Sequence, residues 1–225
     1  MQMPHETHEV DFSQCLVNAG KFTPAELVEH LQDLPPEEWD QKLAQALDEE
    51  ELDVEPIHAA VQKVAAATGN EYGQELELYS DYMCSFLNCC REALGVPCVV
   101  STTPVTIDNQ LQGVTYTVSQ QITGDVSLVG SIMAQEPVFL AIASAYSHMQ
   151  LTDAESDIAA DSVQEFVNVY TGLFGRELAA RHLEVELELP RCGVNVSPDG
   201  SHQLALRIFS GLGVFDVILA IDEFF

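Results

Sequence analysis

The stretch D-S-V-Q-E-F-V-N, from Asp161 to Asn168, repeats the pattern of D-Y-M-C-S-F-L-N, from Asp81 to Asn88, eighty positions earlier. Both copies begin with Asp, end with Asn and place apolar residues two, five and six positions after the Asp. That spacing predicts an amphipathic helix in each copy, with an apolar stripe on one side and polar residues on another. The chain therefore contains a duplicated unit, and its two helices decide how the rest packs.

The polar faces of the two predicted helices differ at one position. In the second copy Asp161, Glu165 and Asn168 fall at i, i+4 and i+7 and share one side of the helix. The first copy keeps the acid and the amide but has serine between them, in the set Asp81, Ser85 and Asn88. Only the second copy therefore pairs a carboxylate with a carboxamide one turn away.

The segments around these helices follow a similar plan in both halves of residues 75–225. The first half reads as a helix over 75–94, then β-branched runs over 97–107, 112–122 and 125–133, and a helix over 137–149. The second half reads as a helix over 160–181, then alternating runs over 183–189, 203–209 and 215–221. This order predicts an internally duplicated α+β fold, with helices on one face of a mostly antiparallel sheet. The chain has no G-x-G-x-x-G, which disfavours a doubly wound nucleotide-binding fold.

Residues 1–72 are expected to form a small all-helical domain or arm ahead of a second domain over residues 75–225. Helix-start signals occur at Thr23-Pro24 and at Pro35-Pro36. A third helix is expected to begin near residues 53–55 and to end at Gly69.

Charge excludes several classes of partner. The formal net charge is −28, with 36 acids against eight Lys and Arg. Binding to nucleic acid or to an anionic membrane rests on Lys and Arg that meet phosphate, so we expect neither partner. The acidity is interpreted as a solvated surface that favours solubility, which can reflect adaptation to salt, with an acidic docking face as the alternative.

The longest apolar run, Val138–Tyr146, is well short of the ~20 residues that span a bilayer.

The first dozen residues lack a secretory signal, so a cytoplasmic location is expected. Six cysteines without a C-x-x-C pair then indicate reduced thiols, most of them in the core. His5, Glu6, His8 and Glu9 are metal-ligand types, but no downstream ligand set follows them, so no metal site is expected.

The second helix resembles the signature of the CheC, CheX and FliY chemotaxis phosphatases. That signature is an acid or Ser, then Glu four positions later, Asn three further on, and Pro after about twenty-two residues. Asp161, Glu165 and Asn168 match it, Gly172 follows at a spacing common in the family, and Pro190 comes after twenty-one intervening residues. The resemblance covers roughly residues 75–225. Because the first copy lacks the Glu, the chain resembles the CheX branch, and Asp81, Ser85 and Asn88 would form a vestigial site.

The resemblance implies hydrolysis of the aspartyl phosphate on a phosphorylated CheY-like receiver, in chemotaxis or two-component signalling. Asn168 would hold a water in line with the phosphorus, and Glu165 would pair with the receiver's active-site lysine. These two residues are the expected catalytic pair, and Asp161 and Gly172 are expected partner contacts. Mg²⁺ would come with the receiver, and no cofactor is expected on this chain.

Other interpretations stay open from the sequence. The chain can be an adaptor that binds receivers or motor components through the same face without turnover. It can also be a scaffold whose exposed strand edges form a homodimer or larger assembly. Glu165 and Asn168 can belong to an ordinary solvated helix face, and Asp161 can be an acid favoured by the helix dipole.

Overall fold

The computed structural model describes Phe22 and residues 54–106, 110–196 and 200–221. In chain order the described elements are α4 (Val54–Thr68), α5 (Glu75–Cys89), a π-helical turn η2 (Cys90–Leu94), β1 (Cys98–Val100), β2 (Thr115–Gly124), β3 (Leu128–Gln135), α6 (Glu136–Ser147), α7 (Asp157–Ala180), β4 (Val185–Leu187), β5 (Arg191–Val194), β6 (Leu204–Ser210) and β7 (Gly213–Ala220).

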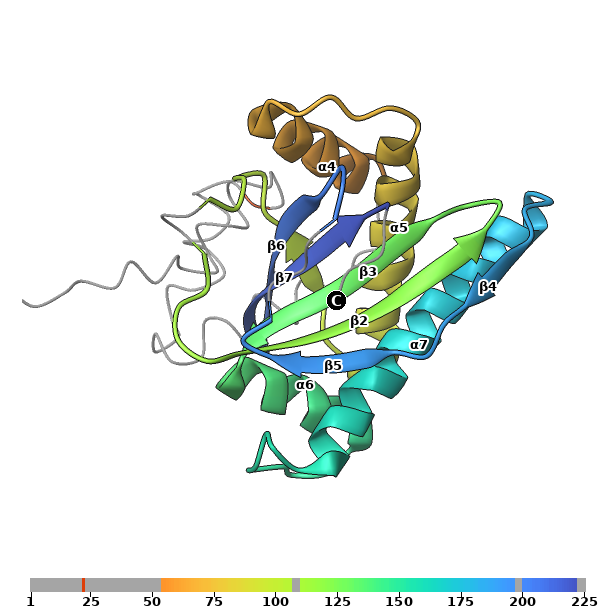
Figure 1. The fold of residues 1–225 in the computed structure, drawn as a ribbon. Coiled ribbons are helices and arrows are strands. Elements are labelled where there is room, and N and C mark those ends of the chain that lie inside the picture. The colour runs from red at the N-terminus through yellow and green to blue at the C-terminus, as the bar shows by residue number, and fades with distance from the viewer. Residues whose placement is uncertain (1–21, 23–53, 107–109, 197–199, 222–225) are drawn as a thin grey trace, which may run out of the picture.

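The strands form one antiparallel sheet in the order β1-β6-β7-β3-β2-β4, and β5 also pairs with β2 (Figure 1). Two hairpins, β2–β3 and β6–β7, occupy its middle and meet where β3 pairs with β7. A row of directly opposed, fully buried side chains crosses all four strands: Val118, Ile132, Val217 and Leu206. This row forms the floor of the hydrophobic core, and the predicted α+β fold is confirmed.

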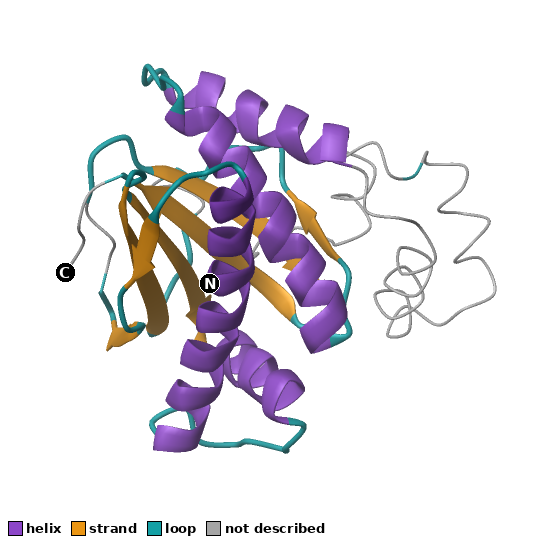
Figure 2. Ribbon diagram, turned by 90° about the vertical axis from the view of Figure 1, so that its right-hand side faces the viewer, coloured by secondary structure: helices purple, strands orange, loops and turns teal. Residues whose placement is uncertain are grey.

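The helices cover one face of the sheet (Figure 2). The helices of the two copies, α5 and α7, pack against each other through their aromatic stripes. Tyr82 meets Phe174 and Phe86 meets Tyr170, each with ring centroids 5.2 Å apart in edge-to-face geometry. Residue numbers rise along one helix as they fall along the other, so the two helices run antiparallel. The apolar stripes predicted from the repeat thus form the centre of the core.

Local sequence explains where α5 and α7 begin and end. Ser156 is the N-cap of α7, since its side chain accepts a hydrogen bond from the backbone N–H of Ala159. Asp157 places an acid in the first turn, where the helix dipole favours it. The helix that starts as α5 continues through η2 and stops at Gly95, whose φ of 67° suits a residue without a Cβ.

The third N-terminal helix predicted from the sequence forms as α4. Val61 and Val64 on α4 are fully buried and belong to the same core as α5 and the sheet. The helix starts predicted at residues 23 and 35, and the cluster from His5 to Glu9, lie outside the described residues. The division into domains at residues 72–75 stays a prediction.

Strand lengths at the two edges of the sheet differ from the expectation. Of the run 97–107, only β1 forms a described strand, because Pro97 and Pro104 lack the N–H that a ladder needs. Of the run 183–189, only β4 is a strand, and it pairs with the last residues of β2. Leu187 and Leu189 are therefore 38% and 86% exposed rather than buried on an apolar face. The strand β5 after Pro190 was not predicted.

None of the described helices combines the length and the hydropathy that a membrane crossing requires.

Candidate functional site

The polar face of the second copy is open to solvent. Asp161, Glu165 and Asn168 are exposed on α7, while Val163 and Phe166 between them are fully buried. None of the ion pairs among the described residues involves Glu165. The structure therefore brings the predicted residues onto one face, with a carboxylate that an external cation can reach.

Helix α6 borders this face. The Tyr146 ring packs on Phe166 with centroids 5.8 Å apart. Burial raises the pKa of Tyr146, and the nearby Glu165 carboxylate acts in the same direction. The phenol therefore stays neutral at physiological pH and adds no charge to the face.

The Asn168 carboxamide is hydrogen-bonded to a residue of the sheet. Its Oδ1 accepts a hydrogen bond of 2.9 Å from Nε2 of Gln120, a β2 residue that is 2% exposed. Sequence reasoning missed Gln120. A signal was present, because strand alternation puts Gln120 on the same face as Val118 and Ile122, where a polar side chain is out of place.

The chain after β4 is tied to the same helix. Gln164 on α7 donates from Nε2 to the backbone oxygen of Pro190, at 2.9 Å. Gln120 donates to the backbone oxygen of Glu188, at 2.8 Å. The proline that the family pattern places after the Asn thus lies beside α7, one turn before Asn168.

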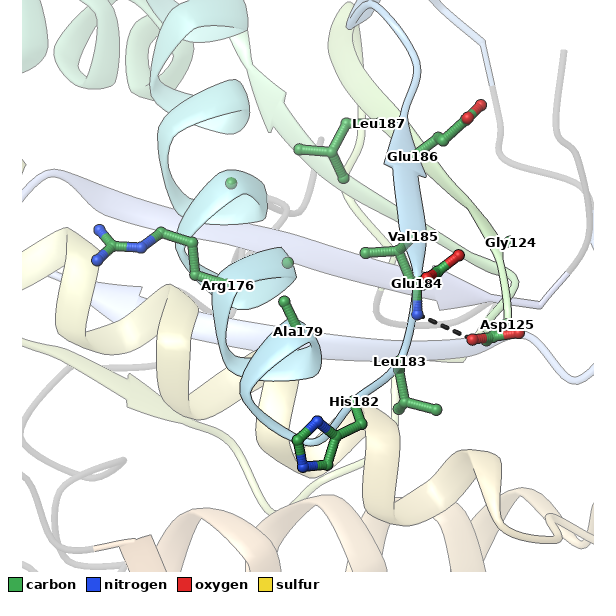
Figure 3. Close-up of a pocket in the computed structure, with 12 residues that line it drawn as sticks. Gly124, Asp125, Arg176, Ala179, His182, Leu183, Glu184, Val185, Glu186 and Leu187 are labelled. Carbon is green, nitrogen blue, oxygen red and sulfur yellow. Dashed lines mark hydrogen bonds between the residues drawn. The ribbon is translucent and has the colours of Figure 1, made fainter.

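An open groove of about 850 Å³ begins one turn beyond Asn168 (Figure 3). Its walls are α7, β4 and the turn between β2 and β3, and Gly172 and Gly175 form its helical side. A Cβ at Gly172 would meet no atom within 4 Å. In the β2–β3 turn, the Asp125 carboxylate accepts a 2.8 Å hydrogen bond from the Glu184 N–H, drawn in Figure 3. The helical side of the groove therefore includes two glycines beside Arg176 and Ala179, and one hydrogen bond joins the β2–β3 turn to the chain before β4.

The substitution Gly172→Ala is expected to stabilise the protein by up to about 1 kcal/mol. Glycine is unfavourable inside a helix by roughly that amount, and the added methyl group has open space. Urea denaturation measures the effect. A midpoint equal to or below that of the wild type would show that Gly172 is conformationally required in α7.

The polar face of the first copy is covered. Asp81 forms an ion pair of 2.5 Å with Arg181 at the end of α7, and its other oxygen lies 3.6 Å from Nε2 of His58 on α4. Ser85 is 6% exposed and donates to the Glu177 carboxylate at 2.8 Å. Asn88 is partly buried. Asp81 and Ser85 therefore contact side chains of other helices, in contrast to the open face of the second copy.

Restoring the missing acid by Ser85→Glu is expected to destabilise the protein by about 2 kcal/mol or more. The new carboxylate would be buried against Glu177, and both burial and like charge disfavour its ionised form. Urea denaturation at pH 8 and pH 5 tests this, because protonation at the lower pH should relieve part of the loss. Ser85→Gln, similar in size but neutral, is the control and should lose less at pH 8.

The described residues contain neither a metal site nor a reactive thiol. No group of three or more His, Cys, Asp or Glu side chains there could hold a metal ion. The five described cysteines are unpaired, and burial raises the pKa of Cys84 and Cys89 to about 11. The Cys84 and Cys89 thiols therefore stay protonated at neutral pH.

Comparison with known proteins identifies the fold. No family model and no curated protein matches the sequence. Among solved structures, a CheX from Desulfovibrio desulfuricans matches with a TM-score of 0.53 at 16% identity, over 65% of this chain and 99% of that one. The CheX–CheY–BeF3–Mg complex from Borrelia burgdorferi contains a match with a TM-score of 0.51 at 19% identity, over 64% and 97%. A CheC-like protein from a Shewanella species gives 0.50 at 15% identity, over 64% and 97%.

This chain therefore has the fold of CheX and CheC-like proteins. The finding confirms, at the level of the fold, the resemblance drawn from the α7 pattern. The match spans nearly the whole of each of those proteins, while about a third of this chain lies outside it.

Proposed function

We propose that this chain hydrolyses the aspartyl phosphate of a CheY-like receiver in chemotaxis or two-component signalling. The observation that carries the proposal is the exposed pair Glu165 and Asn168 on α7, in a fold shared with CheX. A complex of a CheX with CheY among the structures of this fold supports a receiver as the partner. The proposal places the chain in the cytoplasm with that receiver.

The proposed reaction requires few catalytic groups on the phosphatase. An acyl phosphate is already labile, so positioning and charge stabilisation suffice, and no covalent intermediate on this chain is needed. A water oxygen attacks the phosphorus as the bond to the aspartyl oxygen breaks, which yields inorganic phosphate and the free aspartate. The Asn168 amide can orient that water, because it accepts and donates hydrogen bonds at once. The receiver would supply Mg²⁺.

Glu165 would fix the docking register. Its exposed carboxylate can form a charge-assisted hydrogen bond with the receiver's active-site lysine. The net charge of −28 repels a phosphorylated acidic pocket at long range, so this local contact must hold the complex. The groove beside Gly172 would accommodate part of the receiver surface next to that contact.

Phosphate release tests the proposal. Receivers encoded in the same genome are phosphorylated with a small-molecule donor in the presence of Mg²⁺. Phosphate loss is then followed without this protein and with it at one tenth of the receiver concentration. Faster loss with multiple turnovers supports the phosphatase. Saturable binding to the phosphorylated receiver with unchanged phosphate loss would instead identify an adaptor.

A further inference from the structure

Gln120 occupies a position where the fold calls for an apolar side chain. Its neighbours on the helix-facing side of β2 are Tyr116, Val118 and Ile122, all in the hydrophobic core. Gln120 is 2% exposed among them. A buried carboxamide is unfavourable unless its hydrogen bonds are made, so the contacts of Gln120 determine what it does there.

Both hydrogens of the Gln120 amide are engaged. Nε2 donates to the backbone oxygen of Glu188 at 2.8 Å and to Oδ1 of Asn168 at 2.9 Å. A backbone carbonyl can only accept, so the nitrogen of Gln120 must face Glu188. The same nitrogen faces Asn168, which leaves that residue's oxygen as the atom turned toward the sheet.

This contact determines which atoms Asn168 presents outward. With Oδ1 turned toward Gln120, Nδ2 is the other polar atom of a side chain that is exposed on α7. Oδ1 retains a second lone pair, which can accept a hydrogen bond from a water. The amide is thereby set to donate to a phosphoryl oxygen and to accept from the attacking water.

The remaining atom of Gln120 argues against a purely structural role. Its Oε1 is buried and has no hydrogen-bond partner among the described residues. An unpaired buried acceptor is destabilising, and a leucine of similar size would avoid it. A buried polar residue that lowers stability and lies beneath an exposed polar side chain is typical of a functional site.

We propose that Gln120 is a positioning residue. It holds the Asn168 carboxamide with Nδ2 facing outward, toward the phosphoryl group of the receiver that the water attacks. This inference rests on the proposed phosphatase function. Gln120 does not touch the receiver, so its loss should change the chemical step and leave docking intact.

The test compares Gln120→Leu with the wild type and with Gln164→Leu. Gln164→Leu is the matched control. Gln164 is on the same helix as Asn168, and its substitution removes the hydrogen bond to the backbone oxygen of Pro190 while leaving the contact of Asn168 in place. We expect Gln120→Leu to lower kcat about 10-fold, with KM within twofold and with stability in urea unchanged or higher. Gln164→Leu should keep kcat within twofold. An unchanged kcat in Gln120→Leu, or an equal loss in both variants, would overturn the inference.

A second readout does not depend on activity. The ¹⁵N relaxation of the Asn168 side-chain amide, assigned through its absence in Asn168→Ala, should give a rigid order parameter in the wild type. It should fall below about 0.6 in Gln120→Leu. Gln120→Met serves if the leucine variant does not fold. A wild type that fails to speed phosphate loss would refute the proposed function alone, whereas an Asn168 amide equally rigid in both proteins would refute the role of Gln120.

Discussion

Asn168→Ala is expected to lower the acceleration of phosphate loss by at least about 100-fold, while the protein stays folded. Removing one preorganised hydrogen-bonding group from a transition state costs about 2.7 kcal/mol or more, which corresponds to that factor. Asn168 is exposed, so truncation removes the Gln120 contact and little packing. Steady-state kinetics on a phosphorylated receiver, with circular dichroism as the check on folding, measures the change.

Asn88→Ala is the matched control for this prediction. Asn88 holds the equivalent position in the first copy, on α5, but the neighbouring Asp81 and Ser85 are engaged with other helices. This variant should keep activity within about twofold of the wild type, because its effect is confined to packing. Equal losses in the Asn88 and Asn168 variants would mean that the first copy is also an active face.

Gly130→Ala is expected to destabilise the protein by about 3 kcal/mol or more. A Cβ at this β3 position would lie 2.0 Å from the hydroxyl oxygen of Tyr82 and 2.3 Å from its ring carbon Cζ. Tyr82 is fully buried and packs edge-on against Tyr170 and Phe174, so it has no room to withdraw. Overpacking of this kind forces side chains off their rotamers and shifts the backbone. Urea denaturation gives the free energy of unfolding.

Two further variants define the cause of that loss. Tyr82→Phe removes the atom nearest to the new methyl group, so the double variant with Gly130→Ala should recover part of the stability. Gly172→Ala is the same substitution in open space, and it should act in the opposite direction. A Gly130→Ala protein within about 1 kcal/mol of the wild type would contradict the packing of α5 on β3.

The sequence predicted the features that depend on local periodicity. The spacing of Asp161, Glu165 and Asn168 fixes their common side of a helix whatever surrounds it, and the apolar stripe between them decides which side faces inward. The strands β2, β3, β6 and β7 were predicted from β-branched or alternating runs, and the structure adds their pairing as two hairpins.

Features that depend on tertiary contacts could not be predicted in the same way. Nothing local in the sequence indicates that Arg181 and Glu177 reach back to Asp81 and Ser85, so the covering of the first copy appeared only in the structure. Gln120 is a polar residue at an apolar position of the alternation in its strand. Its partner Asn168 lies 48 residues further along the chain, so the sequence did not indicate the contact. The exposure of Leu189 follows from the sheet edge, which strand alternation alone does not locate.

The most direct test of the account is the rate of phosphate loss from a labelled receiver with the wild type and with the double variant Glu165→Ala, Asn168→Ala. The account predicts a clear acceleration by the wild type and a rate indistinguishable from self-hydrolysis with the double variant. A double variant as fast as the wild type would contradict the assignment of the α7 face as the site of the reaction.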